Sequence, residues 1–349
     1  MTPGDASLPV KTDAVIIGAG PVGLFAVFEC GMLGLKCHVV DALESVGGQL
    51  SALYPEKPIY DIPGYPRIDA QDLVKKLEEQ AAPFAPVFHL SQQVTGLAQQ
   101  SGGWRVTTDA GAVIDAAAVI IAAGVGAFGP NRPPLDGIED YEGQGAGQGV
   151  NYLVSRVDDY KDKRIVIAGG GDSAVDWALA LADHAKSLAV VHRRAKFRAA
   201  PESVRRMQDL AKAGAVDMVV PYQLAALEGA GGTLAAVVVS DLGGNEKRLP
   251  ADVLLPFYGL SQNLGPIADW GLDLAKDLIQ VDAGTMGAGK PGLFAVGDIV
   301  TYPGKLKLIL TGFAEAALAA HGAHAVARPG EILHFEYSTT KGVPGGDGK

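Results

Sequence analysis

Four basic residues gather within nine positions of an otherwise acidic chain. The stretch VVHRRAKFR, residues 190–198, contains Arg193, Arg194, Lys196 and Arg198, whereas the formal net charge of the whole protein is −10. The cluster directly follows an apolar run that is typical of a buried strand. Guanidinium groups placed at a strand end can bind a phosphate group, bidentately where the geometry allows.

The first strand–helix–strand unit of the chain carries a glycine fingerprint. In residues 13–42 an apolar run ends in Gly18-x-Gly20-x-x-Gly23, a helical stretch follows, and a second apolar run ends in Asp41. These glycines permit a tight turn, a close backbone approach to a pyrophosphate, and close packing of helix on strand. The carboxylate, 23 residues after the first glycine, can bind ribose hydroxyls. A dinucleotide without a 2′-phosphate, FAD or NAD, is favoured over a structural glycine turn.

Residues 164–194 repeat this pattern with the opposite charge at its end. The turn is Gly169-x-Gly171-x-x-Ala174, and the position 23 residues after its first glycine is a histidine followed by two arginines. A carboxylate there would repel a 2′-phosphate, whereas arginines bind one, so this unit predicts an NADP(H) site. The shared register disfavours the alternative, a solvated basic strand end. The residues expected around the extra phosphate are His192, Arg193, Arg194 and Arg198.

A third strand-end signal lies near the C-terminus. The run GLFAVGDI, residues 292–299, is an apolar strand ending in Gly297-Asp298, and a short loop and a helical stretch follow it. An acid beside a helix N-terminus can bind a ribityl hydroxyl, while the helix end favours negative charge on a reduced flavin. By itself, however, the Gly-Asp pair is typical of an ordinary turn.

These motifs together resemble those of the two-dinucleotide-domain flavoprotein reductases, of which thioredoxin reductase is the familiar member. The matching stretches are GAGPVG, GGQL at 47–50, GGGDSA, HRRAKFRA at 192–199 and GLFAVGD. The resemblance covers nearly the whole length. It implies an α/β fold with two Rossmann-like dinucleotide-binding domains of the three-layer ββα type, the NADPH domain being inserted into the FAD domain. The first fingerprint would then bind FAD and the second NADPH.

The chain departs from thioredoxin reductases at the redox dithiol. The positions of their Cys-x-x-Cys motif are Tyr152 and Ser155 here, and neither can form a disulfide. The two cysteines, Cys30 and Cys37, fit neither a redox pair nor a metal site and are interpreted as reduced core thiols. Electrons that reach the flavin must therefore leave by a route other than a dithiol.

A second departure indicates that route. Residues 47–66 and the C-terminal stretch EILHFEYSTTKGVPGG resemble the ferredoxin–NADP⁺ reductases of the thioredoxin-reductase-like type. The resemblance implies that Tyr54 stacks on one face of the isoalloxazine and that Tyr337 covers the other. The further FAD contacts that it implies are Gly48, Gln49, Val94, Phe128, Asp298 and Thr339, and the matching GGGDSA turn adds Asp172 and Ser173 to the NADPH site.

The implied activity is electron transfer between NADPH and ferredoxin or flavodoxin through FAD. Because the cofactors carry this chemistry, no side chain is nominated as catalytic, and no metal site is expected. Three loop lysines, Lys57, Lys305 and Lys307, are candidates for steering an acidic partner. Two alternatives stay open: an NAD(P)H reductase of flavins, quinones, iron chelates or another protein carrier, and a non-enzymatic flavin redox sensor.

Length and composition set the organisation. A chain of 349 residues is too long for one ordinary core, and we expect an FAD domain at 1–129 and 252–349, with a C-terminal extension at 328–349, around an NADPH domain at 130–251. The acidic charge argues against nucleic-acid binding. No signal peptide or membrane span is recognised, so a cytoplasmic location is expected, and the resemblance implies a homodimer.

Overall fold

A computed structural model of the protein describes residues 9–331, 333 and 342, without the side chains of 127, 128 and 260–262. The chain forms two compact units. Unit 1 consists of Met1–Ala52, Pro58–Ala127 and Gln262–Lys349, and unit 2 consists of Leu53–Lys57 and Phe128–Ser261. The second unit is thus inserted into the sequence of the first, and a short segment after residue 52 groups with unit 2.

Unit 1 is built on a seven-stranded sheet of order β5-β2-β1-β8-β7-β6, in which β21 pairs with the second half of β8. The strands β5, β2, β1, β8 and β21 are parallel, whereas β6, β7 and the start of β8 form an antiparallel meander. The strands are β1 (Val10–Ile17), β2 (Cys37–Val40), β5 (Val87–His89), β6 (Val94–Gln100), β7 (Gly103–Thr108), β8 (Val113–Ile121) and β21 (Leu293–Ala295).

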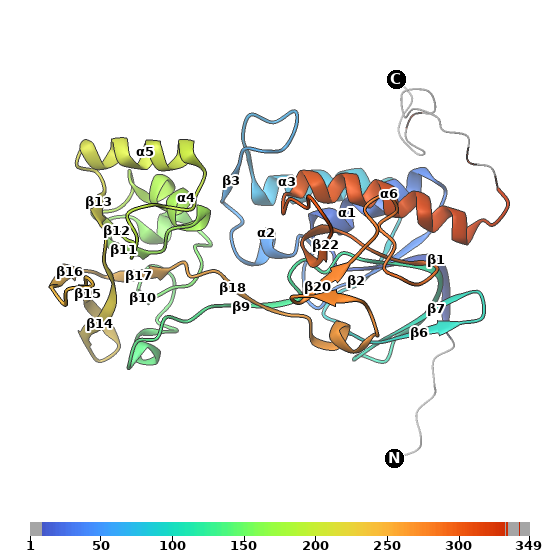
Figure 1. The fold of residues 1–349 in the computed structure, drawn as a ribbon, viewed down its shortest axis with the longest axis horizontal. Coiled ribbons are helices and arrows are strands. Elements are labelled where there is room, and N and C mark those ends of the chain that lie inside the picture. The colour runs from blue at the N-terminus through green and yellow to red at the C-terminus, as the bar shows by residue number, and fades with distance from the viewer. Residues whose placement is uncertain (1–8, 332, 334–341, 343–349) are drawn as a thin grey trace, which may run out of the picture. The chain divides into compact units, whose positions relative to one another are not determined.

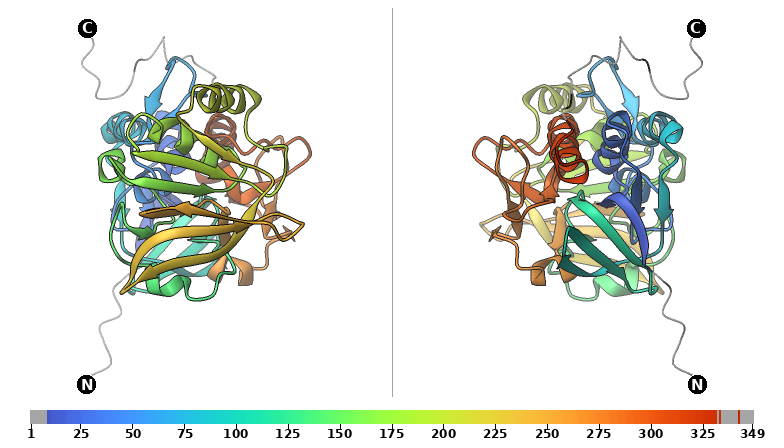
Figure 2. Two further views of the ribbon diagram at one scale, coloured as in Figure 1. Left: turned by 90° about the vertical axis from the view of Figure 1, so that its left-hand side faces the viewer. Right: turned by 90° about the vertical axis from the view of Figure 1, so that its right-hand side faces the viewer.

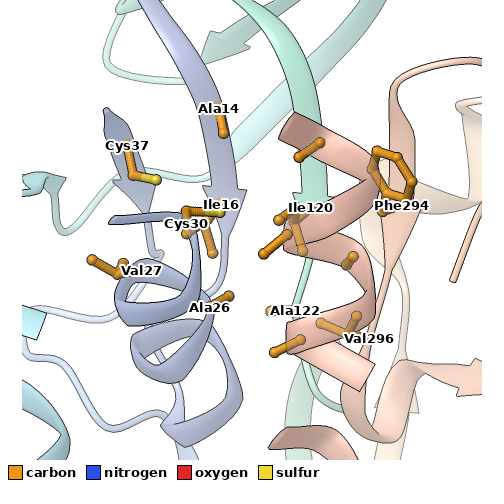
Figure 3. Close-up of a cluster of buried hydrophobic side chains, with 14 of the residues drawn as sticks. Ala14, Ile16, Ala26, Val27, Cys30, Cys37, Ile120, Ala122, Phe294 and Val296 are labelled. Atoms are coloured by element: carbon orange, nitrogen blue, oxygen red, sulfur yellow. The ribbon is translucent and has the colours of Figure 1, made fainter. Parts of the chain in front are cut away.

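Helices cover one face of this sheet and the meander lies toward the other (Figure 1 and the right panel of Figure 2). The helices are α1 (Pro21–Met32), α2 (Gln49–Ala52), α3 (Ala70–Ala81) and α6 (Ile309–Ala327). Figure 3 shows part of the core between this sheet and its helices: Val27 of α1 lies with Ile16 of β1, Ile120 of β8 and Phe294 of β21. Because both faces are covered, the central parallel strands are apolar on both sides.

Short elements complete unit 1. One of them, β22, follows the sheet's last strand β21, pairs with β20 and precedes the loop that leads into α6. The full set is β3 (Pro58–Ile59), β4 (Ile68–Asp69), β19 (Leu274–Ala275), β20 (Leu278–Gln280), β22 (Val300–Thr301) and the 3₁₀ turns η1 (Ala82–Phe84), η4 (Gly265–Asp269) and η5 (Gly297–Ile299).

Unit 2 repeats the layered plan at a smaller size. Its sheet has five parallel strands in the order β10-β17-β11-β12-β13, and a separate antiparallel sheet has the order β14-β15-β16. The parallel strands are β10 (Gly149–Val150), β11 (Arg164–Ala168), β12 (Ser187–Val191), β13 (Asp217–Val219) and β17 (Val253–Pro256). The antiparallel strands are β14 (Gln223–Ala230), β15 (Thr233–Ser240) and β16 (Glu246–Pro250).

Two apolar cores hold the layers of unit 2 together. One lies between the parallel sheet and its helices, and the other between the parallel sheet and the antiparallel one (left panel of Figure 2). The helical elements are α4 (Asp172–Leu181), α5 (Pro201–Lys212) and the turns η2 (Ile138–Tyr141) and η3 (Val157–Tyr160). The connecting segments β9 (Ala127–Pro130) and β18 (Leu260–Asn263) pair with each other. Within the described ranges, no helix is long and apolar enough to cross a membrane.

Candidate functional site

The first glycine fingerprint forms the turn between β1 and α1 at the carboxyl end of the sheet. Gly18 has a φ of +110°, and a Cβ there would lie 2.4 Å from the carbonyl oxygen of Ala122. A Cβ on Gly23 would lie 1.9 Å from the carbonyl oxygen of Gly18. Both positions therefore require glycine, because the backbone after β8 and the backbone of the turn itself leave no space for a Cβ.

Gly20, in contrast, faces open space. No atom lies within 4 Å of the position of a Cβ on Gly20, which immediately precedes the first turn of α1. The second glycine pair approaches the same turn, because the amide of Gly47 donates to the carbonyl of Ala19 at 2.8 Å and a Cβ on Gly48 would lie 3.1 Å from the Cα of Gly20. Gln49 follows as the first residue of α2. The glycine turn and the GGQL loop are therefore brought together at one helix N-terminus.

Asp41 lies beside this turn at the end of β2. Its Oδ2 accepts a hydrogen bond from the amide of Ala19 at 2.6 Å, and its Oδ1 accepts one from Leu43 at 2.8 Å. Burial raises the pKa of Asp41 and outweighs the lowering effect of these two backbone donors. The carboxylate is thus fixed to the fingerprint, with lone pairs left for ribose hydroxyls.

Two further predicted FAD contacts belong to the same unit. The carbonyl of Asp41 accepts a hydrogen bond from the amide of Gln92 at 3.0 Å, two residues before Val94, whose side chain is buried in an apolar core. Asp298 stands in η5 directly after β21, at the same carboxyl edge of the sheet. Burial raises the pKa of the Asp298 carboxyl, and the nearby cations of Lys307 and Lys305 oppose that shift.

A buried ionic network behind Asp298 was not recognised in the sequence. Glu315 of α6 is 2% exposed, and it accepts hydrogen bonds from the amide of Gly297 at 2.7 Å and from the hydroxyl of Tyr302 at 2.6 Å. It also forms an ion pair with Lys305, whose side chain is 6% exposed. The only sign of this network in the sequence is a single acid within the alanine-rich stretch LTGFAEAALAA.

The second fingerprint has the same geometry in unit 2. A Cβ on Gly169 would lie 2.7 Å from the carbonyl oxygen of Phe257, whereas Gly171 has no atom within 4 Å of its Cβ position. Asp172 and Ser173 follow as the exposed first residues of α4. The open glycine again precedes a helix N-terminus, as a pyrophosphate site requires.

The basic cluster lies against this turn. The amide of Arg198 donates to the carbonyl of Gly170 at 2.7 Å, which fixes the cluster beside the glycine loop. The side chains of Arg193, Arg194 and Arg198 are exposed, and in the described part of the chain none of them forms an ion pair with an acid. Three guanidinium groups without anionic partners can receive a phosphate.

His192 takes a different position from the arginines. It is 8% exposed, its ring centroid lies 4.9 Å from that of Phe197, and its Nε2 has no hydrogen-bond partner among the described residues. Burial lowers the pKa of His192, and the neighbouring arginines lower it further, so the imidazole is neutral at physiological pH. An unpartnered nitrogen beneath the glycine loop can accept or donate one hydrogen bond to a bound nucleotide.

Tyr54 lies in a short segment that groups with unit 2. Lys57 forms a 3.1 Å ion pair with Asp176 of α4, Glu56 accepts a hydrogen bond from the amide of Val157 at 2.8 Å, and Tyr54 packs against the helix-side core of unit 2. The other predicted FAD contacts described above belong to unit 1.

Three predicted FAD contacts cannot be placed in the same way. Phe128 belongs to β9, but its side chain is outside what the structure describes. Tyr337 and Thr339 lie outside the described residues altogether. Their roles stay predictions.

The lysine hypothesis is wrong in part. Lys57 is engaged with Asp176, and the ammonium of Lys305 is buried against Glu315, so neither presents a free charge to a partner. Lys307 is exposed and forms no ion pair within the described ranges, although its charge lies close enough to Asp298 to lower the pKa of that carboxyl.

Tyr152, at one of the two positions that correspond to a redox dithiol, has another role. The hydroxyl of Tyr152 donates to Glu142 at 2.5 Å, and burial raises its pKa. Cys30 and Cys37 are free, buried thiols in the core of unit 1 (Figure 3), and the hydrogen bond between them and then burial raise the pKa of Cys30. Within the part of the chain that is described, the two units together therefore fit two nucleotides and no disulfide relay.

Comparison with known proteins identifies the family of the chain. The family model described as pyridine nucleotide-disulphide oxidoreductase matches residues 12–321. A ferredoxin–NADP reductase of Paramagnetospirillum magneticum is 64% identical over 96% of this chain and 99% of its own length. A ferredoxin–NADP reductase of Rhodospirillum rubrum is 61% identical over 97% of this chain and 98% of its own length.

Solved structures support the fold. The thioredoxin reductase of Lactococcus lactis superposes with a TM-score of 0.77 at 25% identity, covering 90% of this chain and 99% of that one. The predicted fold class, two Rossmann-like domains in an α/β chain, is confirmed by this match and by the family model.

Proposed function

The chain belongs to the pyridine nucleotide-disulphide oxidoreductase family and, within it, to the ferredoxin–NADP reductases, and on this premise we propose that it transfers electrons between NADPH and ferredoxin or flavodoxin. The protein is a flavoprotein oxidoreductase that uses FAD and NADP. The observation that carries the proposal is the pair of glycine turns with opposite charges at their strand ends, one beside Asp41 and one beside unpaired arginines.

The residues of unit 1 fit the FAD. The open space at Gly20 admits a pyrophosphate at the N-terminus of α1, and Asp41 is positioned for the adenosine ribose. Gly48 and Gln49 line the same turn, and Asp298 would bind the ribityl chain. Bound FAD supplies the exchange of a hydride for two single electrons, which couples a nicotinamide to a one-electron carrier. The residues of the protein bind the FAD and orient its flavin.

The residues of unit 2 fit NADP. Gly171 leaves space for the pyrophosphate, and Arg193, Arg194 and Arg198 would bind the 2′-phosphate. The unpartnered Nε2 of His192 would take a hydrogen bond from the same nucleotide. No side chain is assigned as a general acid or base, because a hydride moves directly between the two cofactors.

Two tyrosines are proposed to control access to the flavin. Tyr54 would stack on one face, and Tyr337 would cover the face that the nicotinamide uses and would have to move before hydride transfer. The segment of Tyr54 belongs to unit 2, to which Glu56 and Lys57 attach it.

The partner is proposed to be ferredoxin or flavodoxin. A dithiol route is disfavoured, because Tyr152 and Ser155 occupy its positions. Steering of an acidic carrier would depend on local positive charge such as that of Lys307, since the protein as a whole carries −10. The alternative acceptors are free flavins, quinones, iron chelates or another protein carrier, and the acidic net charge disfavours nucleic acid.

A homodimer is proposed on the basis of an aromatic row on unit 1. Phe313 of α6 contacts Phe25 of α1, Phe25 contacts Phe28, and Phe28 contacts Phe84, and all four rings are only partly buried. Phe88 of β5 is 37% exposed. Partly exposed aromatic rows of this kind favour an interface. A cytoplasmic location is proposed as well, because both cysteines are free thiols.

Cytochrome c reduction tests the proposed function. The purified protein is supplied with NADPH, and the rate is measured with and without ferredoxin, with flavodoxin, and with free flavins and quinones as rival acceptors. The proposal predicts that cytochrome c reduction depends on nanomolar to micromolar ferredoxin or flavodoxin. Fast reduction of a free quinone or flavin with no gain from either carrier would establish the alternative acceptor class instead.

A further inference from the structure

One buried acid, Glu315 of α6, binds the loop that carries Asp298. Glu315 is 2% exposed and receives three donors: the amide of Gly297, the hydroxyl of Tyr302 and the ammonium of Lys305. The first donor lies directly before Asp298, and the other two lie in the loop that follows it. Residues on both sides of Asp298 are therefore bound to a single carboxylate on α6, by two hydrogen bonds and one ion pair.

The same place is tightly packed against the first fingerprint. A Cβ on Gly312, one turn before Glu315, would lie 2.4 Å from a methyl group of Val22 in the first turn of α1. Gly297 has a φ of +84° and faces the same valine, with its Cβ position 3.6 Å away. The helix that carries Glu315 therefore packs closely against the helix that faces the pyrophosphate, and the Gly297 turn lies beside the same contact.

The buried acid requires its cation. An isolated carboxylate at 2% exposure is costly, whereas one that is paired and fully hydrogen-bonded is tolerated. Lys305 supplies that charge with a side chain only 6% exposed, and its ammonium also lies 5.6 Å from the centroid of the Tyr302 ring. The pair is neutral as a unit, so it fixes the loop without adding net charge beside Asp298.

We propose that Glu315 and Lys305 are positioning residues for FAD: as a neutral buried pair they hold the Gly297–Asp298 turn in the conformation that binds the flavin end of the cofactor. This inference rests on the proposed FAD site of unit 1. It assigns to Lys305 a role inside the cofactor site in place of the partner-steering role that the sequence indicated.

The test compares four proteins: the wild type, Glu315→Gln, Lys305→Met and the double variant. Gln keeps one oxygen as the acceptor for the Gly297 amide, but it removes the charge and replaces the oxygen that accepts from Tyr302 and Lys305 with an amide NH2. Met keeps approximately the length of the lysine without its charge. Each single variant leaves one buried charge without a partner and is expected to raise the dissociation constant of FAD for the apoprotein at least about tenfold. The double variant restores neutrality and is expected to bind FAD more tightly than either single variant.

A second readout separates positioning from general damage. With FAD bound, Glu315→Gln leaves an extra positive charge and is expected to raise the flavin midpoint potential, whereas Lys305→Met leaves an extra negative charge and is expected to lower it. General loss of structure would not shift the potential in opposite directions. Lys276→Met is the control, an exposed cation of unit 1 outside this loop, and is expected to leave the FAD dissociation constant within about twofold of the wild-type value.

Folding of unit 1 is checked by the cooperative thermal unfolding of each apoprotein, and titration with NADP⁺ checks separately that unit 2 is intact. If a charge variant does not fold, Tyr302→Phe removes one donor and keeps the ion pair, and an approximately fivefold weaker FAD affinity is expected. A wild-type FAD affinity in the foldable variants, or a double variant no tighter than the weaker single one, would overturn the inference. If the wild-type protein itself binds no FAD, the proposed function fails instead.

Discussion

The choice of NADPH over NADH is predicted to depend on Arg193 and Arg194, and the expected effect can be estimated. Their side chains are exposed and, in the described part of the chain, have no acidic partner, so neither has to break an existing ion pair to bind a phosphate. A hydrogen bond to a charged group contributes about 1.5–3 kcal/mol when desolvated, and solvent reduces this to about 1–1.5 kcal/mol for each exposed arginine. Replacing both by alanine should therefore cost about 2–3 kcal/mol, or about 30–150-fold in affinity for NADPH.

The assay is steady-state reduction of ferricyanide with each nicotinamide in turn. In the double variant, kcat/KM for NADPH is expected to fall by that factor, while the value for NADH, which has no 2′-phosphate, stays within about threefold of the wild-type value. Lys196→Ala is the matched control, because it removes one exposed cation from the same segment. Equal losses for the two nicotinamides, or an unchanged preference, would refute the assignment of the 2′-phosphate site.

Three further predictions concern single positions. Gly18→Ala should lower the stability by more than about 2 kcal/mol and abolish FAD retention, because its Cβ would meet the carbonyl oxygen of Ala122 at 2.4 Å, and thermal unfolding with the flavin content of the purified protein checks this. The hydrogen bond from Arg164 lowers the pKa of Asp252 below its ordinary 3.8, so the pair stabilises unit 2 above pH 3.8, and this stabilisation is lost as the pH falls through the lowered pKa. In Asp252→Asn the free energy of unfolding should therefore lack this dependence on pH in the acid range. An acid-unfolding curve identical to that of the wild type would contradict the prediction. Tyr337→Ser should change the rate of hydride transfer and the charge-transfer absorbance in rapid mixing, and unchanged traces would remove the tyrosine from the flavin site.

The parts of the site that follow from backbone conformation could be predicted from the sequence. Gly18 and Gly23 are required by atoms of their own strand–helix turn and of the adjacent strand, and such requirements recur in every unit of this type. The same holds for Asp41, whose distance from the first glycine is fixed by one strand, one helix and one strand. Local pattern and spacing were sufficient because each of these elements is continuous in sequence.

The parts that depend on distant contacts could not be predicted in this way. Lys305 resembled a surface lysine in a polar loop, and only the packing of α6 shows that Glu315 takes it into the interior. Similarly, the segment around Tyr54 lies within the sequence of unit 1, but Lys57 pairs with Asp176, far along the chain, and the segment groups with unit 2. No periodicity or motif encodes either partner.

Anaerobic rapid mixing tests the central claim most directly. The protein is first reduced with one equivalent of NADPH and then mixed with oxidised ferredoxin, and the visible absorbance of the ferredoxin itself is followed. The account predicts bleaching of the ferredoxin in step with reoxidation of the flavin, at a rate that falls as salt is added. A flavin that is reduced by NADPH but stays reduced in the presence of ferredoxin would contradict the account.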